Sequence, residues 1–213
     1  MFKEDLLTGK RILVTGGGSG LGAAMARRFL ELGAELFICG RRRDVLEASA
    51  RTMVAEAGGK VTPITCDIRV AEAVDEMMEG IWATGPLAVL VNNAAGNFIA
   101  QTNKLSFRAA DTIIATTLHG ALYCTLAAGR RWIDQNDPGV VLSILSTSTR
   151  TGRAFTVPSA IAKSGVLAMT RSLAVEWGPK GIRTVAIAPG PFPTPGAWER
   201  LYPSERGGGE GIT

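Results

Sequence analysis

The sequence predicts an α/β protein in which helices cover both faces of a parallel sheet. Short apolar segments alternate with longer segments of helical periodicity along the chain, without an internal repeat or a linker. Near the N-terminus, an apolar strand leads directly into a glycine-rich turn and then into a helical pattern. This alternation indicates parallel strands, because each helix returns the chain to the end of the sheet where the previous strand began.

The same pattern places each element along the chain. Strands are expected near residues 11–15, 35–39, 61–66, 87–92, 139–145 and 182–188. Helices are expected near residues 20–32, 43–57, 70–82, 105–131 and 158–177. Ligands of such sheets bind beyond the carboxyl ends of the strands, so the residues that follow each strand are the candidates for function.

Composition limits the class of protein. The chain has 213 residues, of which 46% are hydrophobic and 20% are charged, as is usual for one globular domain. We expect neither a membrane span nor a signal peptide, because no sufficiently long apolar run is present. Cys39, Cys66 and Cys124 lack metal-ligand spacing, so we expect no metal site and reduced cysteines in a cytoplasmic protein. The dispersed net charge of +4 favours small acidic ligands over nucleic acid.

The first strand and its turn predict a phosphate site. Residues 12–22 read I-L-V-T-G-G-G-S-G-L-G, with five glycines in seven positions before a helix. Bare backbone lets a pyrophosphate approach closely, and a helix N-terminus offers unpaired N–H groups and a partial positive charge. The spacing is T-G-x-x-x-G-x-G rather than the common G-x-G-x-x-G, and the alternative is an ordinary connection between strand and helix.

The second strand is followed by Gly40 and then by Arg41, Arg42 and Arg43. A site for NAD usually carries an acidic residue here, which binds the ribose 2′-hydroxyl group. The alternative is a solvated charge run at the start of a helix. Cations at a helix N-terminus are mildly unfavourable, and a bound 2′-phosphate would reverse this effect. The segment therefore favours NADP(H) over NAD(H).

Polar residues also follow the third and fourth strands. Asp67 is placed to accept a hydrogen bond from an adenine amino group, or else to cap the helix that begins near Val70. Residues 92–98 read N-N-A-A-G-N-F, and small residues at a strand end let a flat ring lie against the backbone. The alternative for this second segment is a plain turn.

Together, T-G-x-x-x-G-x-G, D-I, N-N-A-A-G, a helix bearing a lysine and A-P-G-P resemble the short-chain dehydrogenase/reductase family. The resemblance runs from about Arg11 to Arg200. Within the family, G-R-R-R-D-V-L, N-N-A-A-G-N-F, V-P-S-A-x-A-K and A-V-E-W-G-P-K are most similar to the 2,4-dienoyl-CoA reductases. The resemblance implies a Rossmann-type doubly wound parallel sheet and NADPH-dependent reduction of a 2,4-dienoyl or enoyl acyl-CoA thioester, a reaction of fatty acid β-oxidation.

The resemblance also implies which residues bind the ligands. By this resemblance, the glycine turn binds the diphosphate and Arg41 binds the 2′-phosphate. Residues 189–192 bind the nicotinamide carboxamide. The implied cofactor residues are Gly16, Gly18, Ser19, Gly20, Leu21, Gly22, Arg41, Arg42, Asp67, Ile68, Asn93, Ala94, Ala95, Gly96, Lys163, Pro189, Gly190, Pro191 and Phe192. The implied acyl-CoA residues are Arg69, Phe98, Ser106 and Arg200. Arginines suit the phosphates of CoA, but Phe98 could instead be a core residue, Ser106 a helix cap and the arginines solvated.

The implied catalytic centre departs from the family pattern. Most members carry Tyr-x-x-x-Lys, whereas this chain has Ser159 and Lys163, one helical turn apart on one face. Lys163 would hold the nicotinamide ribose and favour hydride chemistry through its charge. Ser146 occupies the position of the family's substrate-orienting serine. A serine hydroxyl cannot replace tyrosine as a proton donor near neutral pH.

A branch of the dienoyl-CoA reductases supplies a tyrosine earlier in the loop, but here that position is Ser148. Asn97 matches an asparagine that helps to polarise the thioester in those enzymes. The catalytic set is therefore Lys163, Asn97, Ser146 and Ser159, with the proton supplied by water or by a nearby group. His119 is the only histidine, and a single helical histidine is more often structural.

Two alternatives stay open: a family reductase of another carbonyl or enoyl compound, and an NADP-binding member without turnover. Family members commonly assemble through two long helices, so we expect a homodimer or homotetramer. We treat residues 1–213 as a single NADP(H)-binding domain in which residues 191–213 form a substrate loop and flexible tail. We expect the family's C-terminal helix and strand to be absent from this sequence.

Overall fold

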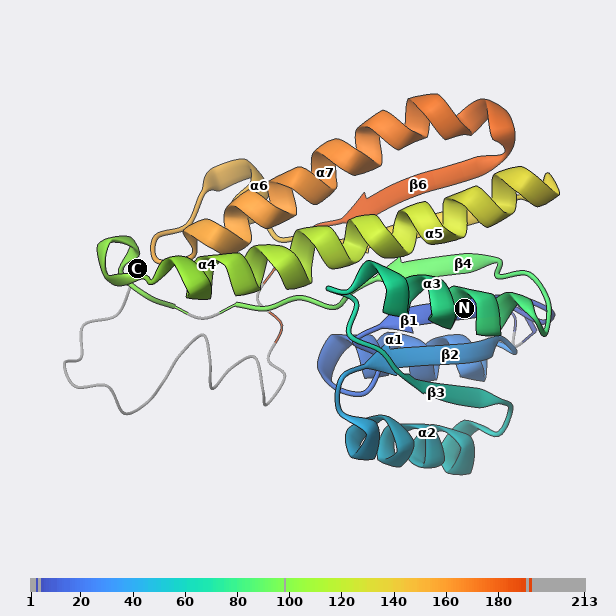
Figure 1. Ribbon diagram of the computed structural model, residues 1–213. Helices are drawn as coiled ribbons and strands as arrows, with labels where there is room; N and C mark the ends of the chain where they lie inside the picture. Colours follow the sequence, from blue (N-terminus) through green and yellow to red (C-terminus); the bar gives the residue numbers. More distant parts are fainter. Residues whose placement is uncertain (1–2, 4, 98, 191, 193–213) are drawn as a thin grey trace.

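The computed structural model describes residues 3, 5–97, 99–190 and 192. Six strands form one sheet in the order β3-β2-β1-β4-β5-β6, and all neighbouring strands are parallel (Figure 1). The strands are β1 (Arg11–Thr15), β2 (Glu35–Gly40), β3 (Val61–Thr65), β4 (Val89–Asn92), β5 (Gly139–Ile144) and β6 (Ile182–Ile187). The predicted α/β fold and its doubly wound parallel sheet are therefore confirmed.

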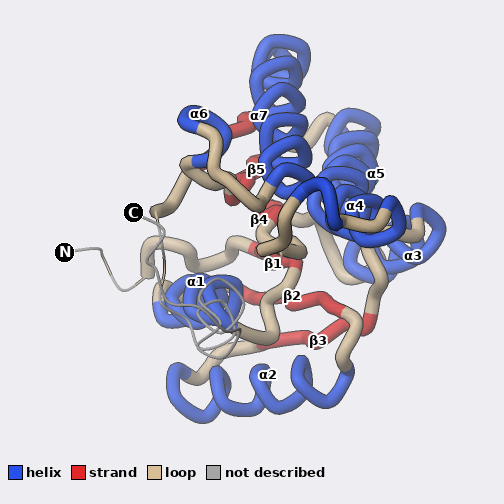
Figure 2. Tube along the Cα trace, turned by 90° about the vertical axis from the view of Figure 1, so that its left-hand side faces the viewer, coloured by secondary structure: helices blue, strands red, loops and turns tan. Residues whose placement is uncertain are grey.

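The helices cover both faces of this sheet (Figures 1 and 2). Helices α1 and α2 pack on one face, and α3, α5 and α7 on the other. The described helices are α1 (Gly20–Glu31), α2 (Arg43–Ala57), α3 (Ala71–Trp82), α4 (Phe107–Ile114), α5 (Gly120–Gln135), α6 (Ser148–Thr151) and α7 (Val157–Trp177).

Burial on both faces explains why the central strands β1, β2 and β4 read as apolar runs. In β1, Leu13 packs with α3 and α5, whereas Ile12 and Val14 pack with α1 and α2. Successive side chains of a strand point to opposite faces, so a strand covered on both sides has no polar positions to alternate with.

The expected helix at residues 105–131 differs from the observed one in three ways. Its start is at Phe107, because the Ser106 hydroxyl accepts a hydrogen bond from the backbone N–H of Ala109 at 3.2 Å and caps the helix. A π-helical segment, Ala115–His119, separates α4 from α5. The end is at Gln135, followed by Asn136 in the left-handed conformation (φ 54°). Apolar periodicity reveals such a helix but not the extra residue of a π-turn.

The expectation that no segment could span a bilayer was wrong in terms of length and composition. The continuous helix Phe107–Gln135 has 29 residues and a window of mean hydropathy 1.2, which meets both requirements of a membrane span. Half of that window is nevertheless buried inside the protein, as in a core helix. Trp132 of this helix is fully buried and donates a hydrogen bond to the Leu87 carbonyl oxygen.

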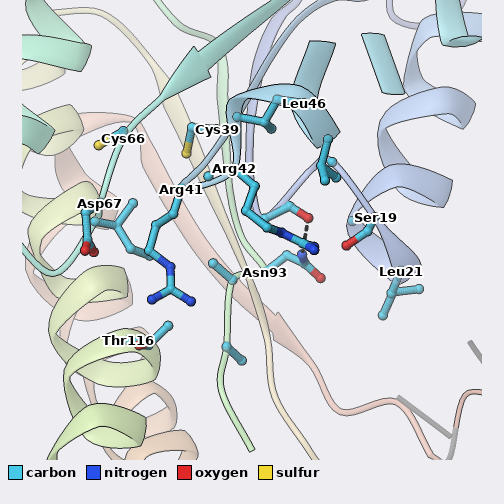
Figure 3. Close-up of a pocket in the computed structure, with 18 residues that line it drawn as sticks. Ser19, Leu21, Cys39, Arg41, Arg42, Leu46, Cys66, Asp67, Asn93 and Thr116 are labelled. Carbon is cyan, nitrogen blue, oxygen red and sulfur yellow. Dashed lines mark hydrogen bonds between the residues drawn. The ribbon is translucent and has the colours of Figure 1, made fainter. Parts of the chain in front are cut away.

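The direction in which successive strands are added to the sheet reverses between β1 and β4. The chain places β2 and β3 on one side of β1, and β4, β5 and β6 on the other. The connections that follow β1 and β4 lead to helices on opposite faces of the sheet, and the crevice at such a point is where these sheets bind ligands. Figure 3 shows the cavity at this end of the sheet.

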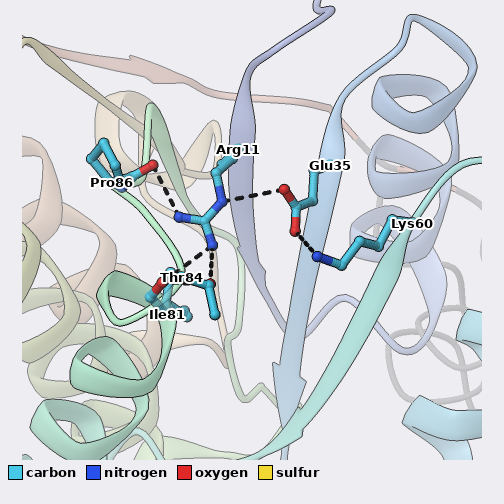
Figure 4. Close-up of polar contacts among 6 residues, drawn as sticks. All are labelled: Arg11, Glu35, Lys60, Ile81, Thr84 and Pro86. Atoms are coloured by element: carbon cyan, nitrogen blue, oxygen red, sulfur yellow. Dashed lines mark hydrogen bonds and ion pairs between the residues drawn. The ribbon is translucent and has the colours of Figure 1, made fainter.

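Arg11 joins several elements at the opposite end of the sheet (Figure 4). Its guanidinium donates to Glu35 at 3.3 Å, to the Ile81 carbonyl oxygen at 3.1 Å and to the Pro86 carbonyl oxygen at 3.3 Å. Lys60 lies 2.6 Å from the other oxygen of Glu35, and its ammonium lowers the pKa of that carboxyl group. This arginine therefore connects β1 and β2 to the end of α3 and the loop before β4.

We expect Arg11→Met to lower the free energy of unfolding by about 2 kcal/mol, because it removes donors from partly buried acceptors. The matched control is Arg27→Met on α1, whose side chain is 51% exposed. This control should change the stability by less than about 1 kcal/mol. Urea unfolding of the three proteins measures both values. Equal losses in the two variants would contradict the anchoring role.

Candidate active site

A cavity of about 430 Å³ lies at the carboxyl ends of β1, β2, β3 and β4 (Figure 3). Most of the predicted cofactor residues border it: Gly16, Gly18, Ser19, Leu21, Gly22, Arg41, Arg42, Asp67, Ile68, Asn93, Ala94 and Ala95. The remaining lining residues were not predicted as site residues, and they are Cys39, Gly40, Val45, Leu46, Cys66 and Thr116. Gly40, Val45 and Leu46 belong to the G-R-R-R-D-V-L segment, but small and apolar residues are equally common in the core and did not indicate a ligand.

The glycine turn is shaped by backbone conformation and by close packing. Gly16 and Gly20 have φ values of +66° and +56°, which favour glycine. A Cβ atom on Gly22 would lie 2.3 Å from the Gly16 carbonyl oxygen and 2.5 Å from Nδ2 of Asn93. A side chain at residue 22 would therefore push the turn away from the loop after β4.

Helix α1 begins within this turn, and no side chain of the described residues caps its N-terminus. Ser19 is the N-cap residue, but its side chain makes no capping hydrogen bond. The first turn of α1 contains no acidic residue. The first backbone N–H groups and the positive end of the helix dipole are therefore available to an anion, and this donor set fits the diphosphate of a dinucleotide.

Thr15 and Asn93 tie the ends of β1 and β4 together. Oγ1 of the buried Thr15 accepts hydrogen bonds from the backbone N–H groups of Asn93 and Ala94, both at 3.0 Å, and donates to the Val91 carbonyl oxygen at 3.3 Å. The Asn93 amide in turn donates to the Thr15 carbonyl oxygen at 2.9 Å. The segment after β4 is therefore more than a plain turn, because it fixes one wall of the cavity.

The three arginines after β2 have different roles. Arg43 begins α2, is exposed and pairs with Glu47 at 2.7 Å, as the charge-run alternative expects. Arg41 and Arg42 border the cavity (Figure 3), and the described part of the chain offers neither of them a hydrogen-bond or ion-pair partner. Arg41 and Arg42 are thus available to an anionic ligand.

Asp67 does not cap a helix, so that alternative was wrong. Helix α3 begins at Ala71, its N-cap is Val70, and no side chain caps it. The Asp67 carboxylate instead accepts hydrogen bonds from Nε of Arg69 at 2.9 and 3.1 Å and from a terminal nitrogen of the same guanidinium at 2.5 Å. These bonds lower the pKa of Asp67, and the nearby charge of Arg41 contributes to the shift. Arg69, predicted as an acyl-CoA residue, lies outside the cavity lining and pairs with Asp67.

Three of the predicted catalytic residues, Ser146, Ser159 and Lys163, lie near the carboxyl end of β5 and are not part of the cavity lining. Ser159 and Lys163 lie one turn apart on α7, and both are buried. Nζ of Lys163 donates a hydrogen bond to the Ile144 carbonyl oxygen at the end of β5. Burial lowers the pKa of Lys163 to about 8. Oγ of Ser146 accepts a hydrogen bond from the Ser148 hydroxyl at 3.1 Å.

Asn97 lies on the loop that leaves β4, and its Oδ1 atom is buried without a hydrogen-bond partner among the described residues. The π-helical segment supports this loop, because Oγ1 of Thr117 accepts a hydrogen bond from the Gly96 N–H at 3.2 Å. The Ala100 N–H donates to the Phe155 carbonyl oxygen at 3.2 Å, which joins the loop to the segment before α7. The loop that carries Asn97 is therefore held by the π-helical segment and by the segment before α7.

Other predicted residues lie apart from the cavity. Ser106 caps α4, which is the structural role considered for it. His119 is exposed, and its ring centroid lies 6.0 Å from that of Tyr123. Pro189, Gly190 and Phe192 follow β6, and Phe192 is exposed. Phe98, Pro191, Arg200 and nearly all of the predicted substrate loop and tail at residues 191–213 fall outside the described residues.

The three cysteines are free and buried in one core cluster, and two of them border the cavity. Burial raises the pKa of Cys66 to about 11 and raises the pKa values of Cys39 and Cys124 as well. The described residues contain no cluster of three His, Cys, Asp or Glu side chains that could hold a metal ion.

Comparison with known proteins relates this site to a family. A family model described as short chain dehydrogenase matches residues 10–202. An uncharacterized oxidoreductase of Caenorhabditis elegans is 47% identical over 203 residues, which are 93% of this chain and 64% of the relative. A probable 2,4-dienoyl-CoA reductase of Bacillus subtilis is 43% identical over 199 residues, which are 92% of this chain and 78% of that enzyme.

Solved structures agree with this relationship. A short chain dehydrogenase from Bacillus anthracis superposes with a TM-score of 0.81 at 39% identity, covering 85% of this chain and 76% of that one. A citronellol catabolism dehydrogenase from Pseudomonas aeruginosa has a TM-score of 0.84 at 34% identity, covering 89% of this chain and 77% of that one.

The lowered pKa of Lys163 predicts a pH-dependent stability. Burial disfavours its ammonium group, so the penalty on folding is full below pH 8 and is lost as the pH rises from about 8 to 10.5. Relative to Lys163→Met, the free energy of unfolding of the unmutated protein should therefore rise over this range by on the order of 3 kcal/mol. Urea unfolding at several pH values measures it, with the exposed Lys180→Met as control. A difference that stays constant with pH would contradict the burial effect.

Proposed function

The chain belongs to the short chain dehydrogenase family, and on that premise we propose that it is an NADPH-dependent oxidoreductase that reduces a 2,4-dienoyl or enoyl thioester of coenzyme A. The observation that carries the proposal is the cavity with a bare glycine turn and two arginines that have no partner among the described residues, in a chain 43% identical to a probable 2,4-dienoyl-CoA reductase. We infer the acyl-CoA substrate from the name of this relative and from those of two similar probable 2,4-dienoyl-CoA reductases of Caenorhabditis elegans.

The cofactor assignment follows from the charges of the cavity. Members of this family use NAD(P)(H), and the residues present fit such a dinucleotide, because the glycine turn borders the cavity and the first turn of α1 has neither a side-chain cap nor an acidic residue. The position after β2 that would bind a ribose 2′-hydroxyl group through a carboxylate is occupied here by Gly40 and Arg41. Guanidinium groups bind phosphate through parallel hydrogen bonds, so Arg41 and Arg42 support the choice of NADPH.

The bound cofactor would supply a hydride, and the side chains of this chain would prepare the substrate for it. In our proposal the Asn97 amide donates a hydrogen bond to the thioester carbonyl oxygen and so stabilises the negative charge that develops there. Lys163 holds a positive charge at neutral pH close to the end of β5, despite its burial. Ser159 stays protonated at neutral pH, so the proton that completes the reduction comes from water or another group.

A second candidate is a cofactor-binding member without turnover. Two observations favour it: a buried serine stands in the position of the family's tyrosine, and the Lys163 amine is engaged with the Ile144 carbonyl oxygen. In this candidate the cavity binds the dinucleotide as in the first, but no substrate is reduced.

We expect NADPH to bind at least about tenfold more tightly than NADH, a difference of about 1.4 kcal/mol. Arg41→Ala should remove most of this difference, because the guanidinium that faces the 2′-phosphate is lost. The matched control is Arg43→Ala, since Arg43 is bound to Glu47 on the surface of α2. Calorimetric dissociation constants for both cofactors test this expectation. Equal constants in the unmutated protein would refute the cofactor assignment.

The loss of NADPH absorbance with a 2,4-dienoyl-CoA, an enoyl-CoA and a simple ketone tests the reaction itself. We expect turnover of the thioesters, and Asn97→Ala should lower kcat by roughly tenfold or more while leaving the NADPH dissociation constant nearly unchanged. Reduction of the ketone alone would indicate another reductase of the family. Tight NADPH binding with no reduction of any compound would support the member without turnover.

A further inference from the structure

Asp67 presents a difficulty for the proposed cofactor. It is the one acidic residue in the described lining of the cavity, and it lies on the same side as Arg41 (Figure 3). A carboxylate near a guanidinium competes with any phosphate for that guanidinium. The attraction between such opposite charges is substantial at the effective dielectric constant of a protein surface.

Arg69 removes this competition in the structure. Both carboxylate oxygens of Asp67 accept hydrogen bonds from the Arg69 guanidinium, at distances between 2.5 and 3.1 Å. The charge of Arg41 acts on Asp67, but no ion pair forms between the two side chains. Asp67 is thus already paired with Arg69, which lies outside the cavity lining, and the guanidinium of Arg41 remains available to a phosphate.

The turn that carries this pair is well fixed. The Val70 N–H donates to the Asp67 carbonyl oxygen at 3.0 Å, and the Arg69 N–H donates to Oδ1 of Asp67 at 3.1 Å. Between them the buried side chain of Ile68 packs against Gly120 of α5, where a Cβ atom would lie 2.5 Å from Cδ1 of Ile68. Because the partners are two residues apart on a held turn, little conformational entropy is lost when they pair.

We propose that Arg69 is a specificity-determining positioning residue, which pairs with Asp67 and thereby leaves Arg41 free for the 2′-phosphate of NADPH. Arg69 acts through Asp67 and does not itself touch the cofactor. The role rests on the proposed choice of NADPH. It predicts that loss of Arg69 affects the 2′-phosphate in particular, because an unpaired Asp67 both attracts Arg41 and repels the phosphate.

The experiment measures dissociation constants by calorimetry for NADPH, NADH, 2′,5′-ADP and 5′-ADP. Arg69→Gln should weaken NADPH and 2′,5′-ADP roughly five- to tenfold and change NADH and 5′-ADP by less than about twofold. Arg69→Lys keeps the charge but not the paired geometry and should give an intermediate loss. Arg27→Gln, which removes a surface arginine paired with Glu31 and Glu56, is the control for a general charge effect.

The double variant Asp67→Asn/Arg69→Gln separates this role from a merely structural one. Since the competing charge is then absent, the ratio of NADH to NADPH dissociation constants should return toward that of the unmutated protein. The inference is overturned if Arg69→Gln and Arg69→Lys leave this ratio unchanged, or if the double variant is no more selective than Arg69→Gln. An unmutated protein without preference for NADPH would overturn the cofactor assignment and this inference together, whereas preserved preference in the Arg69 variants overturns this inference alone.

Discussion

The contact between the turn after β1 and the loop after β4 is the constraint on which the rest of the site depends. Gly22 lies so close to the Gly16 carbonyl oxygen and to Asn93 that no side chain fits between them. Thr15 and Asn93 exchange hydrogen bonds across the same junction. Since β1 and β4 are neighbours in the sheet, this junction sets the width of the crevice and aims the N-terminus of α1 into it.

The charges around the cavity favour an anionic ligand, as the backbone of the glycine turn does. The first turn of α1 has no acid, Arg41 and Arg42 are unpaired within the described chain, and Asp67 is held by Arg69. The cavity therefore presents a net positive surface at the carboxyl ends of β1, β2 and β3. An anionic ligand is favoured there for the same reason that an acidic side chain would be unfavourable in its place.

The second part of the site is organised by α7 and by the interrupted helix α4–α5. Lys163 reaches the end of β5 through a buried hydrogen bond, so its position depends on the packing of α7 against the sheet. The π-helical segment places Thr117 under the loop that carries Asn97 and turns Thr116 toward the cavity.

The sequence by itself determined the architecture and the cofactor side of the site. The central strands are buried on both faces and therefore read as apolar runs, and a phosphate turn must be glycine-rich, so these strands and the glycine turn at residues 16–22 could be predicted from local composition. The edge strands β3 and β6 were placed by the alternation of strand and helix segments. Only the tertiary structure decided which polar groups meet. Ser159 and Lys163 share a helix face in any sequence reading, but the Ile144 partner of Lys163 lies on another element. The Thr15 hydrogen bonds to Asn93, the π-turn below Gly96 and the choice of Asp67 between a helix cap and Arg69 likewise depend on contacts or geometry that periodicity does not encode. Periodicity reports which face of an element is buried, whereas the pairing of buried polar groups is settled only when the elements pack.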